Sequence, residues 1–255
     1  MKKRGCLIFA HNNGTIDYER LAQKSAENIE RHLGLPTAIV TGDPGAKGGN
    51  RWFADYGETV PWYNNKRSSA YLATPFEETI LLDADYVVAS NQLNRLFESD
   101  KDFLCHRTAT SVTGANWNNQ INYFGNYKFP MWWATVVYFR KSDTANAIFN
   151  AWHMVRENYK HYARLYNFKQ QPFRNDFALS IALGIATGHH LTNEFDIPWD
   201  LASMVPEDRL ELLDTDSYKV SYKNGERDMY LHINNMDFHA MGKKHLEEIY
   251  RQKDS

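Results

Sequence analysis

The chain has 255 residues, of which 43% are hydrophobic and 24% are charged, and its formal net charge at pH 7 is −2. A chain of this length can bury a core of its own, and we expect one α/β domain over residues 1–255. The small net charge excludes a global basic field for gripping nucleic acid and leaves room only for a local basic patch.

Two features of the sequence bear on where the protein is found. Cys6 and Cys105 each lie within an expected strand, and free buried thiols are typical of a reducing compartment. The apolar run at residues 6–10 is too short for the core of a signal peptide, and no window approaches the ~18 apolar residues of a membrane span. We therefore expect a cytoplasmic protein with no membrane span.

The first forty residues predict a strand, a helix and a second strand. Residues 5–10 form a continuous apolar run, which is typical of a central strand buried on both faces. Asp17 is the expected N-cap of an amphipathic helix that ends at Gly34, and residues 37–41 are the next strand. A strand, a helix and a strand in this order indicate a βαβ unit and a parallel sheet.

The remaining elements are expected in the following order. They are a loop at 45–62, a helix at 64–73, a strand at 80–82, a short helix at 91–97, a strand at 102–106, a polar loop at 107–130, a strand at 133–139, helices at 142–161 and 174–186, a largely irregular stretch with short strands at 218–222 and 230–233, and a helix at 244–251. A loop as long as 107–130 in a compact domain is usually functional.

The strand at 80–82 ends in two aspartates, Asp83 and Asp85, separated by Ala84. In a strand, residues i and i+2 face the same way, so we expect these two side chains to converge while Ala84 points elsewhere. Two carboxylates at such a short distance repel one another unless a cation lies between them. A hard cation such as Mg²⁺ or Mn²⁺ commonly bridges carboxylates to substrate phosphates. The same pattern is also common as solvated turn chemistry at a strand end, and the motif alone leaves both interpretations open.

Several motifs in order resemble a known family. The first βαβ unit, the segment 75–85 (Pro-Phe-Glu-Glu-Thr-Ile-Leu-Leu-Asp-Ala-Asp) and a late His-x-x-Gly with lysines resemble the nucleotide-sugar glycosyltransferases of the A-type (GT-A) fold. The nearest likeness is to the retaining, glycogenin-like family 8 group. The resemblance implies a Rossmann-like single domain with a mainly parallel mixed sheet flanked by helices and an irregular C-terminal part. Residues 1–106 would form the nucleotide-binding half, and residues 107–255 the acceptor-side half.

The resemblance also implies a metal site. Asp83 and Asp85 would hold the cation against the two phosphates of a UDP-type donor, and His239 matches the family's late metal-ligand histidine. A nitrogen ligand beside carboxylates suits Mn²⁺ better than Mg²⁺. The family pattern continues His-x-x-Gly-x-x-Lys-Pro-Trp, whereas here Lys243 and Lys244 follow Gly242 directly. This departure leaves open which lysine contacts the leaving phosphate.

Further positions match the family's donor site. A set of residues is expected to bind the nucleotide sugar: Ala10, His11, Asn12, Tyr18, Lys66, Arg67, Asp83, Ala84, Asp85, Gly242, Lys243 and Lys244. Within it, the end of the first strand would cup the base, Tyr18 would stack on it, and Lys66 and Arg67 would pair with phosphate. An ordinary polar loop and a solvated charged face are the alternatives for these positions.

The sugar side is expected to involve four residues. Trp132 and Trp133 occupy the place of the family's Asn-Ser-Gly strand. The Asn-Ser-Gly motif itself is absent from this sequence, so the donor sugar cannot be named from it. Burial in the hydrophobic core is the alternative role for both tryptophans. Asn175 and Asp176 match the acidic position that opens a helix facing the donor sugar, although an Asp in a first helical turn is also a common cap. Asp176 and Lys243 are therefore the expected catalytic residues.

The implied reaction is transfer of a sugar from a nucleoside-diphosphate sugar to a hydroxyl of a glycan, a protein or a modified nucleic acid. A phosphatase of the haloacid dehalogenase type also carries Asp-x-Asp after an apolar strand, but usually in its first strand. A third hypothesis is a binding module without chemistry, in which aromatic residues and nearby cations stack on bases. The residues considered for it are Tyr123, Tyr127, Trp132, Trp133, Arg107 and Lys128.

Overall fold

The structure is a computed structural model that describes residues 2–12, 16–41, 66–114, 123–168, 173–190 and 192–253. The loop expected at 45–62 lies outside the described residues, as do residues 64 and 65 of the helix expected at 64–73.

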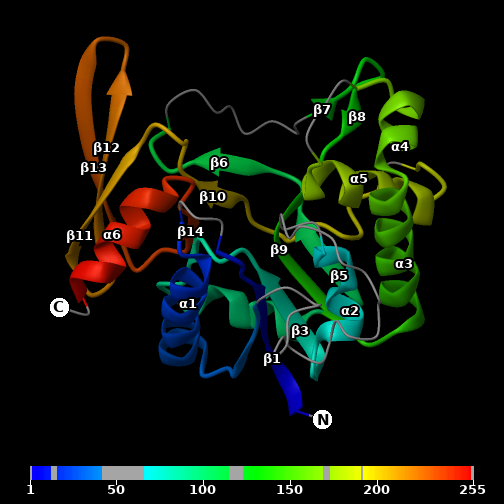
Figure 1. Cartoon of the computed structure of the whole chain (residues 1–255), viewed down its shortest axis with the longest axis horizontal. Coiled ribbons are helices and arrows are strands. Elements are labelled where there is room, and N and C mark those ends of the chain that lie inside the picture. The colour runs from blue at the N-terminus through cyan, green and yellow to red at the C-terminus, as the bar shows by residue number, and fades with distance from the viewer. Residues whose placement is uncertain are drawn as a thin grey trace.

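A five-stranded mixed sheet forms the centre of the molecule (Figure 1). β1 pairs in parallel with β2 on one side and β3 on the other, whereas β9 is antiparallel to both β3 and β5. The predicted α/β class, a mixed and mainly parallel sheet flanked by helices, is confirmed. In spatial order the strands are β2 (Thr37–Val40), β1 (Lys2–Phe9), β3 (Phe76–Leu82), β9 (Trp133–Arg140) and β5 (Phe103–His106).

A second, smaller sheet brings the end of the chain to the end of β3. Its strands, in spatial order, are β4 (Tyr86–Val87), β14 (Phe238–His239), β10 (Leu201–Ser203) and β6 (Ala109–Ser111). β14 is antiparallel to β4 and parallel to β10. Because β4 follows the two aspartates directly, this pairing places β14 beside them.

The helices form two groups (Figure 1). α1 (Tyr18–Leu33) packs against α6 (Lys243–Lys253), and α3 (Asp143–Glu157) packs against α5 (Asn175–Ala186) and is followed by α4 (Tyr159–Leu165). The helix expected at 64–73 is a 3₁₀ turn, η2 (Arg67–Ser69), that leads into the short α2 (Ala70–Ala73). The helix expected at 91–97 is the 3₁₀ helix η3 (Gln92–Glu98).

Helix ends follow the capping residues. Asp17 accepts a hydrogen bond from the backbone N–H of Arg20, at 3.0 Å, and Gly34 takes the left-handed conformation, with φ of 67°, and closes α1. Both predicted ends of this helix are confirmed. The helix expected at 142–161 begins after Ser142, whose hydroxyl accepts from the N–H of Ala145, but is interrupted at Asn158 and continues as α4.

The C-terminal stretch is more regular than predicted. β11 (Arg209–Asp214), β12 (Ser217–Asn224) and β13 (Arg227–Asn234) form an antiparallel sheet whose β12–β13 hairpin extends away from the body (Figure 1). Asn224 pairs with Arg227, so Gly225 and Glu226 form a two-residue turn, and Gly225 supplies the positive φ, 62°, that such turns need. The expected strands at 218–222 and 230–233 are the central parts of β12 and β13.

The segment 107–130 also contains strands that periodicity did not predict. β6, β7 (Tyr123–Phe124) and β8 (Phe129–Pro130) lie in its described parts. Each has only two or three residues, which is too short for an alternation of apolar and polar residues to be recognised.

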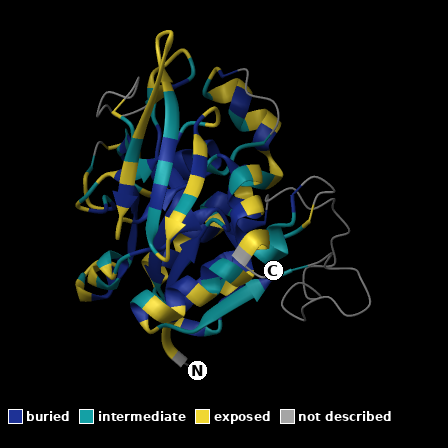
Figure 2. Cartoon of the chain, turned by 90° about the vertical axis from the view of Figure 1, so that its left-hand side faces the viewer, coloured by how far each residue is buried: buried dark blue, intermediate teal, exposed yellow. Residues whose placement is uncertain are grey.

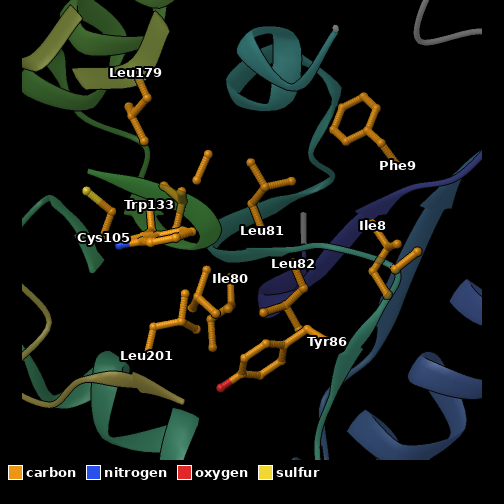
Figure 3. Packing of buried hydrophobic residues seen from close by; sticks show 14 of the residues in the cluster. Ile8, Phe9, Ile80, Leu81, Leu82, Tyr86, Cys105, Trp133, Leu179 and Leu201 are labelled. Carbon is orange, nitrogen blue, oxygen red and sulfur yellow. The ribbon is translucent and has the colours of Figure 1, made fainter. Parts of the chain in front are cut away.

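The core follows the alternation of side chains along β3. Figure 3 shows Leu81 on one face of this strand and Ile80 and Leu82 on the other, where they pack toward Leu201 and Tyr86. Burial is concentrated in this centre, whereas β13 and the tip of the β12–β13 hairpin are largely exposed (Figure 2). Because β3 is buried on both faces, the turn at its end has a rigid support. No helix among the described residues has the length and apolar character needed to cross a bilayer.

Because His106 is buried, we expect the stability of the fold to decrease at acidic pH. Burial lowers the pKa of its imidazole from 6.5 to about 3, and neither ring nitrogen has a hydrogen-bond partner among the described residues. Between these pH values the unfolded chain binds a proton that the folded chain does not, so the free energy of unfolding decreases as the pH falls, by up to about 1.4 kcal/mol per pH unit. We expect His106→Gln to flatten this dependence.

Urea unfolding of the wild type and of His106→Gln at a series of pH values from 7 to 4 measures the effect, because the difference between the two slopes isolates His106 from the other titrating groups. Identical slopes in both proteins would contradict the prediction.

Candidate active site

The two aspartates converge because of a turn and not because of a strand. β3 ends at Leu82, and the N–H of Tyr86 donates to the carbonyl of Asp83 at 3.1 Å, which closes a turn over Asp83–Asp85. The N–H of Asp83 donates to the carbonyl of Thr135 on β9, at 3.0 Å, which ties the start of the turn to the central sheet. The expected proximity of the two carboxylates is therefore found, although the reason differs from continued strand geometry.

Arg67 forms a buried ion pair with Asp83. Its guanidinium is almost fully buried, with 1% of the residue exposed, and its Nη1 lies 2.6 Å from Oδ1 of Asp83. The same guanidinium donates to the carbonyls of Leu82 and Ala134, on β3 and β9. Arg67 thus fixes the carboxylate to the two strands that carry the site.

His239 and Lys243 converge on Asp85 from the C-terminal part of the chain. The Nε2 atom of His239 and the Nζ atom of Lys243 each lie 3.3 Å from Oδ2 of Asp85. The N–H of Ala240 donates to the carbonyl of Asp85 at 2.9 Å, so the backbone pairing of β4 and β14 sets the position of the ring. Asp85 is 3% exposed and His239 8% exposed, and both are therefore shielded from water.

The charges of this cluster shift one another's titration. Burial raises the pKa of Asp83, and Arg67 offsets only part of that increase. Burial would also raise the pKa of Asp85, but His239 and Lys243 together hold it below its usual value. Burial opposes the charged form of His239, yet the Asp85 carboxylate raises its pKa, and the same carboxylate raises that of Lys243.

The donor atoms suit a divalent cation. One ligand atom from each of Asp83, Asp85 and His239 can be chosen so that all three lie within 4.8 Å of one another. Two ligands about 2.1 Å from one ion and at right angles to each other lie about 3 Å apart, close to the 3.3 Å that separates Oδ2 of Asp85 from Nε2 of His239. Two oxygens and one imidazole nitrogen fit Mn²⁺ or Mg²⁺, with positions left for phosphate oxygens.

Asp176 lies on the other side of the same cavity. It is in the first turn of α5, where its Oδ1 accepts from the N–H of Ala134, at 2.9 Å, and its Oδ2 lies 3.0 Å from the guanidinium of Arg174. Asp83, His239 and Asp176 line one cavity of about 200 Å³, together with Arg67, Trp133 to Thr135, Phe173 to Asn175 and Met241. The structure therefore brings the expected sugar-facing carboxylate to the expected metal ligands.

Tyr18 lies at the Lys243 end of this cluster. The Nζ of Lys243 is 5.9 Å from the centre of the Tyr18 ring, and burial raises the pKa of the phenol. Ala10 is buried at the end of β1, and its N–H donates to the carbonyl of Val40. His11 follows it and is partly buried. The exposed Asn12 accepts from the N–H of Glu19 through its Oδ1, so its side chain supports the start of α1.

The remaining expected donor-site residues differ in exposure. Lys66 and Ala84 are buried, and Lys244 is exposed. Lys243, and not Lys244, lies beside Asp85. A Cβ added at Gly242 would come within 3.2 Å of the carbonyl oxygen of Asp208, so a small residue is favoured there.

The side chains of Trp132 and Trp133 line two different cavities. Trp133 lines the cavity of the aspartates, whereas Trp132 lines a second cavity, and both are buried. Five residues of the first cavity had not been assigned a role: Ala134, Thr135, Phe173, Arg174 and Met241. Arg174 could have been found from its position two residues before Asp176, whereas the other four carry no signal in the sequence.

Comparison with known proteins gives distant structural likeness only. No known protein family matches the chain, and no curated protein matches it in sequence. Among solved structures, the glycosyltransferase GlyE of Streptococcus pneumoniae TIGR4 is 14% identical over 72% of this chain and 43% of its own, with a TM-score of 0.39.

Two further glycosyltransferase structures are similar to a comparable degree. The bifunctional glycosyltransferase WbbM is 9% identical over 58% of this chain and 34% of its own, with a TM-score of 0.35. The galactosyltransferase LgtC, solved with donor and acceptor sugar analogs, is 13% identical over 70% of each chain, with a TM-score of 0.39. The chain spans less than half the length of GlyE and WbbM.

Proposed function

We propose that this protein is a metal-dependent glycosyltransferase that moves a sugar from a nucleoside-diphosphate sugar, a UDP-sugar in the first instance, to an acceptor hydroxyl. One observation carries the proposal: Asp83 and His239, which with Asp85 can hold a divalent cation, share a cavity with the carboxylate of Asp176. A nucleoside-diphosphate sugar whose diphosphate is bound at the cation of Asp83, Asp85 and His239 would have its sugar directed toward Asp176. Retention of configuration is proposed from the family resemblance.

The residues of the cluster have separate roles in this reaction. Asp83, Asp85 and His239 would bind Mn²⁺ or Mg²⁺, which supplies positive charge to the leaving diphosphate as the glycosidic bond breaks. Lys243 contributes a second positive charge at the same end of the site, and Arg67 keeps the Asp83 carboxylate in place. Asp176 faces the positive charge that develops on the sugar and orients the acceptor hydroxyl.

The distinguishing experiment compares two substrate classes. The protein is incubated with a panel of UDP-sugars and, separately, with p-nitrophenyl phosphate, each with Mn²⁺, with Mg²⁺ and with EDTA. Release of UDP that requires the metal supports the glycosyltransferase. Hydrolysis of p-nitrophenyl phosphate without release of UDP would instead favour the phosphatase, which the position of Asp83 behind a complete βαβ unit argues against.

Asp176→Asn tests the sugar-facing role. The variant keeps an oxygen that can accept from Ala134, so we expect a small effect on stability. It loses the negative charge beside the sugar, and we expect kcat to fall about 100-fold while the affinity for UDP and Mn²⁺ is retained. Steady-state kinetics together with calorimetric titration of UDP measure both quantities. An unchanged kcat would mean that Asp176 only ties α5 to β9.

The two adjacent lysines provide a matched pair of variants. Lys243→Ala removes the ammonium group beside Asp85, and we expect kcat/KM for the UDP-sugar to fall about 10- to 100-fold. Lys244→Ala removes the same charge from an exposed position and should change kcat/KM less than about twofold. The reverse order of effects in the kinetic assay would contradict the assignment of the phosphate contact to Lys243.

A further inference from the structure

A second cavity, of about 520 Å³, lies beside the candidate active site. Its walls come from the β7–β8 hairpin, from α5 and the turn after it, and from Arg107 and Trp132. Ligand pockets in proteins typically measure about 300–1,000 Å³, so this cavity can hold a small molecule with one or two rings.

Aromatic rings form the inner surface of this cavity. Trp132 and Phe195 are 5% and 6% exposed, and Phe129 packs edge-on against Tyr166, with ring centroids 4.9 Å apart. Gly184 of α5 makes this packing possible, because a Cβ there would come within 2.6 Å of the Phe129 ring. Flat apolar walls of this kind suit a planar base or the apolar face of a sugar ring.

The charged lining is positive. Arg107 and Lys128 are its charged residues, the imidazoles of His189 and His190 also line it, and none of its described lining residues is acidic. Three of these four side chains are exposed at the rim, whereas Arg107 is 9% exposed and lies over Trp132, with its guanidinium carbon 5.5 Å from the ring centre. The lining is therefore complementary to an anion that carries a ring.

The Arg107 guanidinium forms no ion pair with an acidic side chain among the described residues. Its Nη1 donates to two neutral groups, the carbonyl of Thr192 and Oδ1 of Asn193. Asp196 accepts from the backbone N–H of Arg107 but does not line the cavity. A guanidinium that is not paired with a carboxylate is a good partner for a phosphate.

Two rim residues are held in an unfavourable backbone conformation. Lys128 has a φ of 53° and His189 a φ of 63°, in the left-handed region that side-chain-bearing residues rarely adopt. Both of these residues line the same cavity. His189 lies in the turn that ends α5 and Lys128 in the turn of the β7–β8 hairpin, so these two turns set the positions of the rim residues.

The cavity is separate from the candidate active site. The two cavities share no lining residue, and the segment Trp132–Trp133 and α5 lie between them. Asp176 and Ser180 are one turn apart on α5, and each lines a different cavity. The hydroxyl of Ser180 accepts from the N–H of Trp132, at 2.7 Å, and ties this shared wall together.

We propose that the second cavity is a binding site for an organic phosphate that carries a ring, either an aromatic ring or a sugar. The ring packs against Trp132 and Phe129, and the phosphate is bound by Arg107 and Lys128. This site does not depend on the metal, on the donor or on the proposed transferase activity.

Calorimetric titration of the whole protein in EDTA, without nucleotide, tests the proposal. Phenyl phosphate and glucose 6-phosphate are the probes, and inorganic phosphate and phenyl glucoside lack the ring and the charge, respectively. We expect at least one probe to bind with a Kd of about 1 mM or below and at least about 10-fold more tightly than either control compound. A Kd above about 1 mM for both probes, or binding no tighter than that of a control compound, would overturn the proposal.

Variants locate the binding. Lys128→Glu, at an exposed position, and Arg107→Gln should each weaken binding of the probe about 10-fold. Lys101→Glu makes the same charge change at an exposed position away from the cavity and should leave the Kd unchanged. Asp85→Asn should also leave it unchanged, which separates this site from the proposed donor site. If Arg107→Gln does not fold, Lys128→Glu decides, and wild-type affinity in that variant would overturn the proposal.

Discussion

We expect Asp85→Asn to lower the metal-dependent release of UDP from a UDP-sugar by at least about 100-fold. The substitution keeps the size of the side chain and removes the negative charge on which His239 and Lys243 converge. A neutral amide is a poor ligand for Mn²⁺ or Mg²⁺, so both the metal and the diphosphate that it binds should be lost.

The effect should appear mainly as lost affinity for the metal. Titration of the enzyme with Mn²⁺ at a fixed concentration of UDP-sugar is expected to require at least about 10-fold more metal in the variant. Asp100→Asn makes the same chemical change on an exposed residue and serves as the control. Wild-type turnover and wild-type metal dependence in Asp85→Asn would remove the chemical basis of the proposed reaction.

We expect Arg67→Met to decrease the free energy of unfolding by about 3–5 kcal/mol. Arg67 is buried, and it pairs with Asp83 and donates to carbonyls of β3 and β9. Methionine fills similar space without any of these interactions, and it leaves a largely buried carboxylate without its cation. Activity should fall as well, because Asp83 loses the group that positions it.

Arg4→Met is the matched control for this variant. Arg4 pairs with Glu78 at 2.5 Å, but the Arg4 side chain is 43% exposed, and ion pairs at such positions contribute less than about 1 kcal/mol. Urea unfolding of the two variants and the wild type measures the difference. Equal losses of stability in the two variants would mean that burial of the Arg67–Asp83 pair has little energetic consequence.

The elements with strong local signals could be predicted from the sequence. α1 begins and ends at its capping residues, Asp17 and Gly34, and the buried strands β1, β3 and β9 each contain a short apolar run. Gly225 is a turn signal between the short strands expected at 218–222 and 230–233, and it lies in the two-residue turn of the β12–β13 hairpin.

The contacts that complete the site depend on pairings between distant segments. His239 reaches Asp85 through the pairing of β14 with β4, two strands of two residues each, which no periodicity can reveal. The resemblance to a family suggested His239, but its geometry follows only from the fold. The proximity of Asp83 and Asp85 was expected from strand alternation, whereas a turn produces it.

Adjacent residues in an extended segment illustrate what the sequence left open. Trp132 and Trp133 were both expected at the sugar site, but successive side chains of an extended chain point to opposite sides. Trp133 therefore lines the cavity that also contains Asp83 and Asp176, and Trp132 lines the second cavity beside Arg107. Similarly, only the fold distinguishes Lys243, beside Asp85, from the exposed Lys244.

Calorimetric titration of UDP into the wild-type protein, with Mn²⁺ and with EDTA, tests most directly whether the cluster at the end of β3 binds a diphosphate through a cation. We expect binding in Mn²⁺ that weakens at least about 10-fold in EDTA, and that weakens to the same extent in Asp85→Asn even with Mn²⁺ present. Equal affinity for UDP with and without the metal, or no binding of UDP under either condition, would contradict the account.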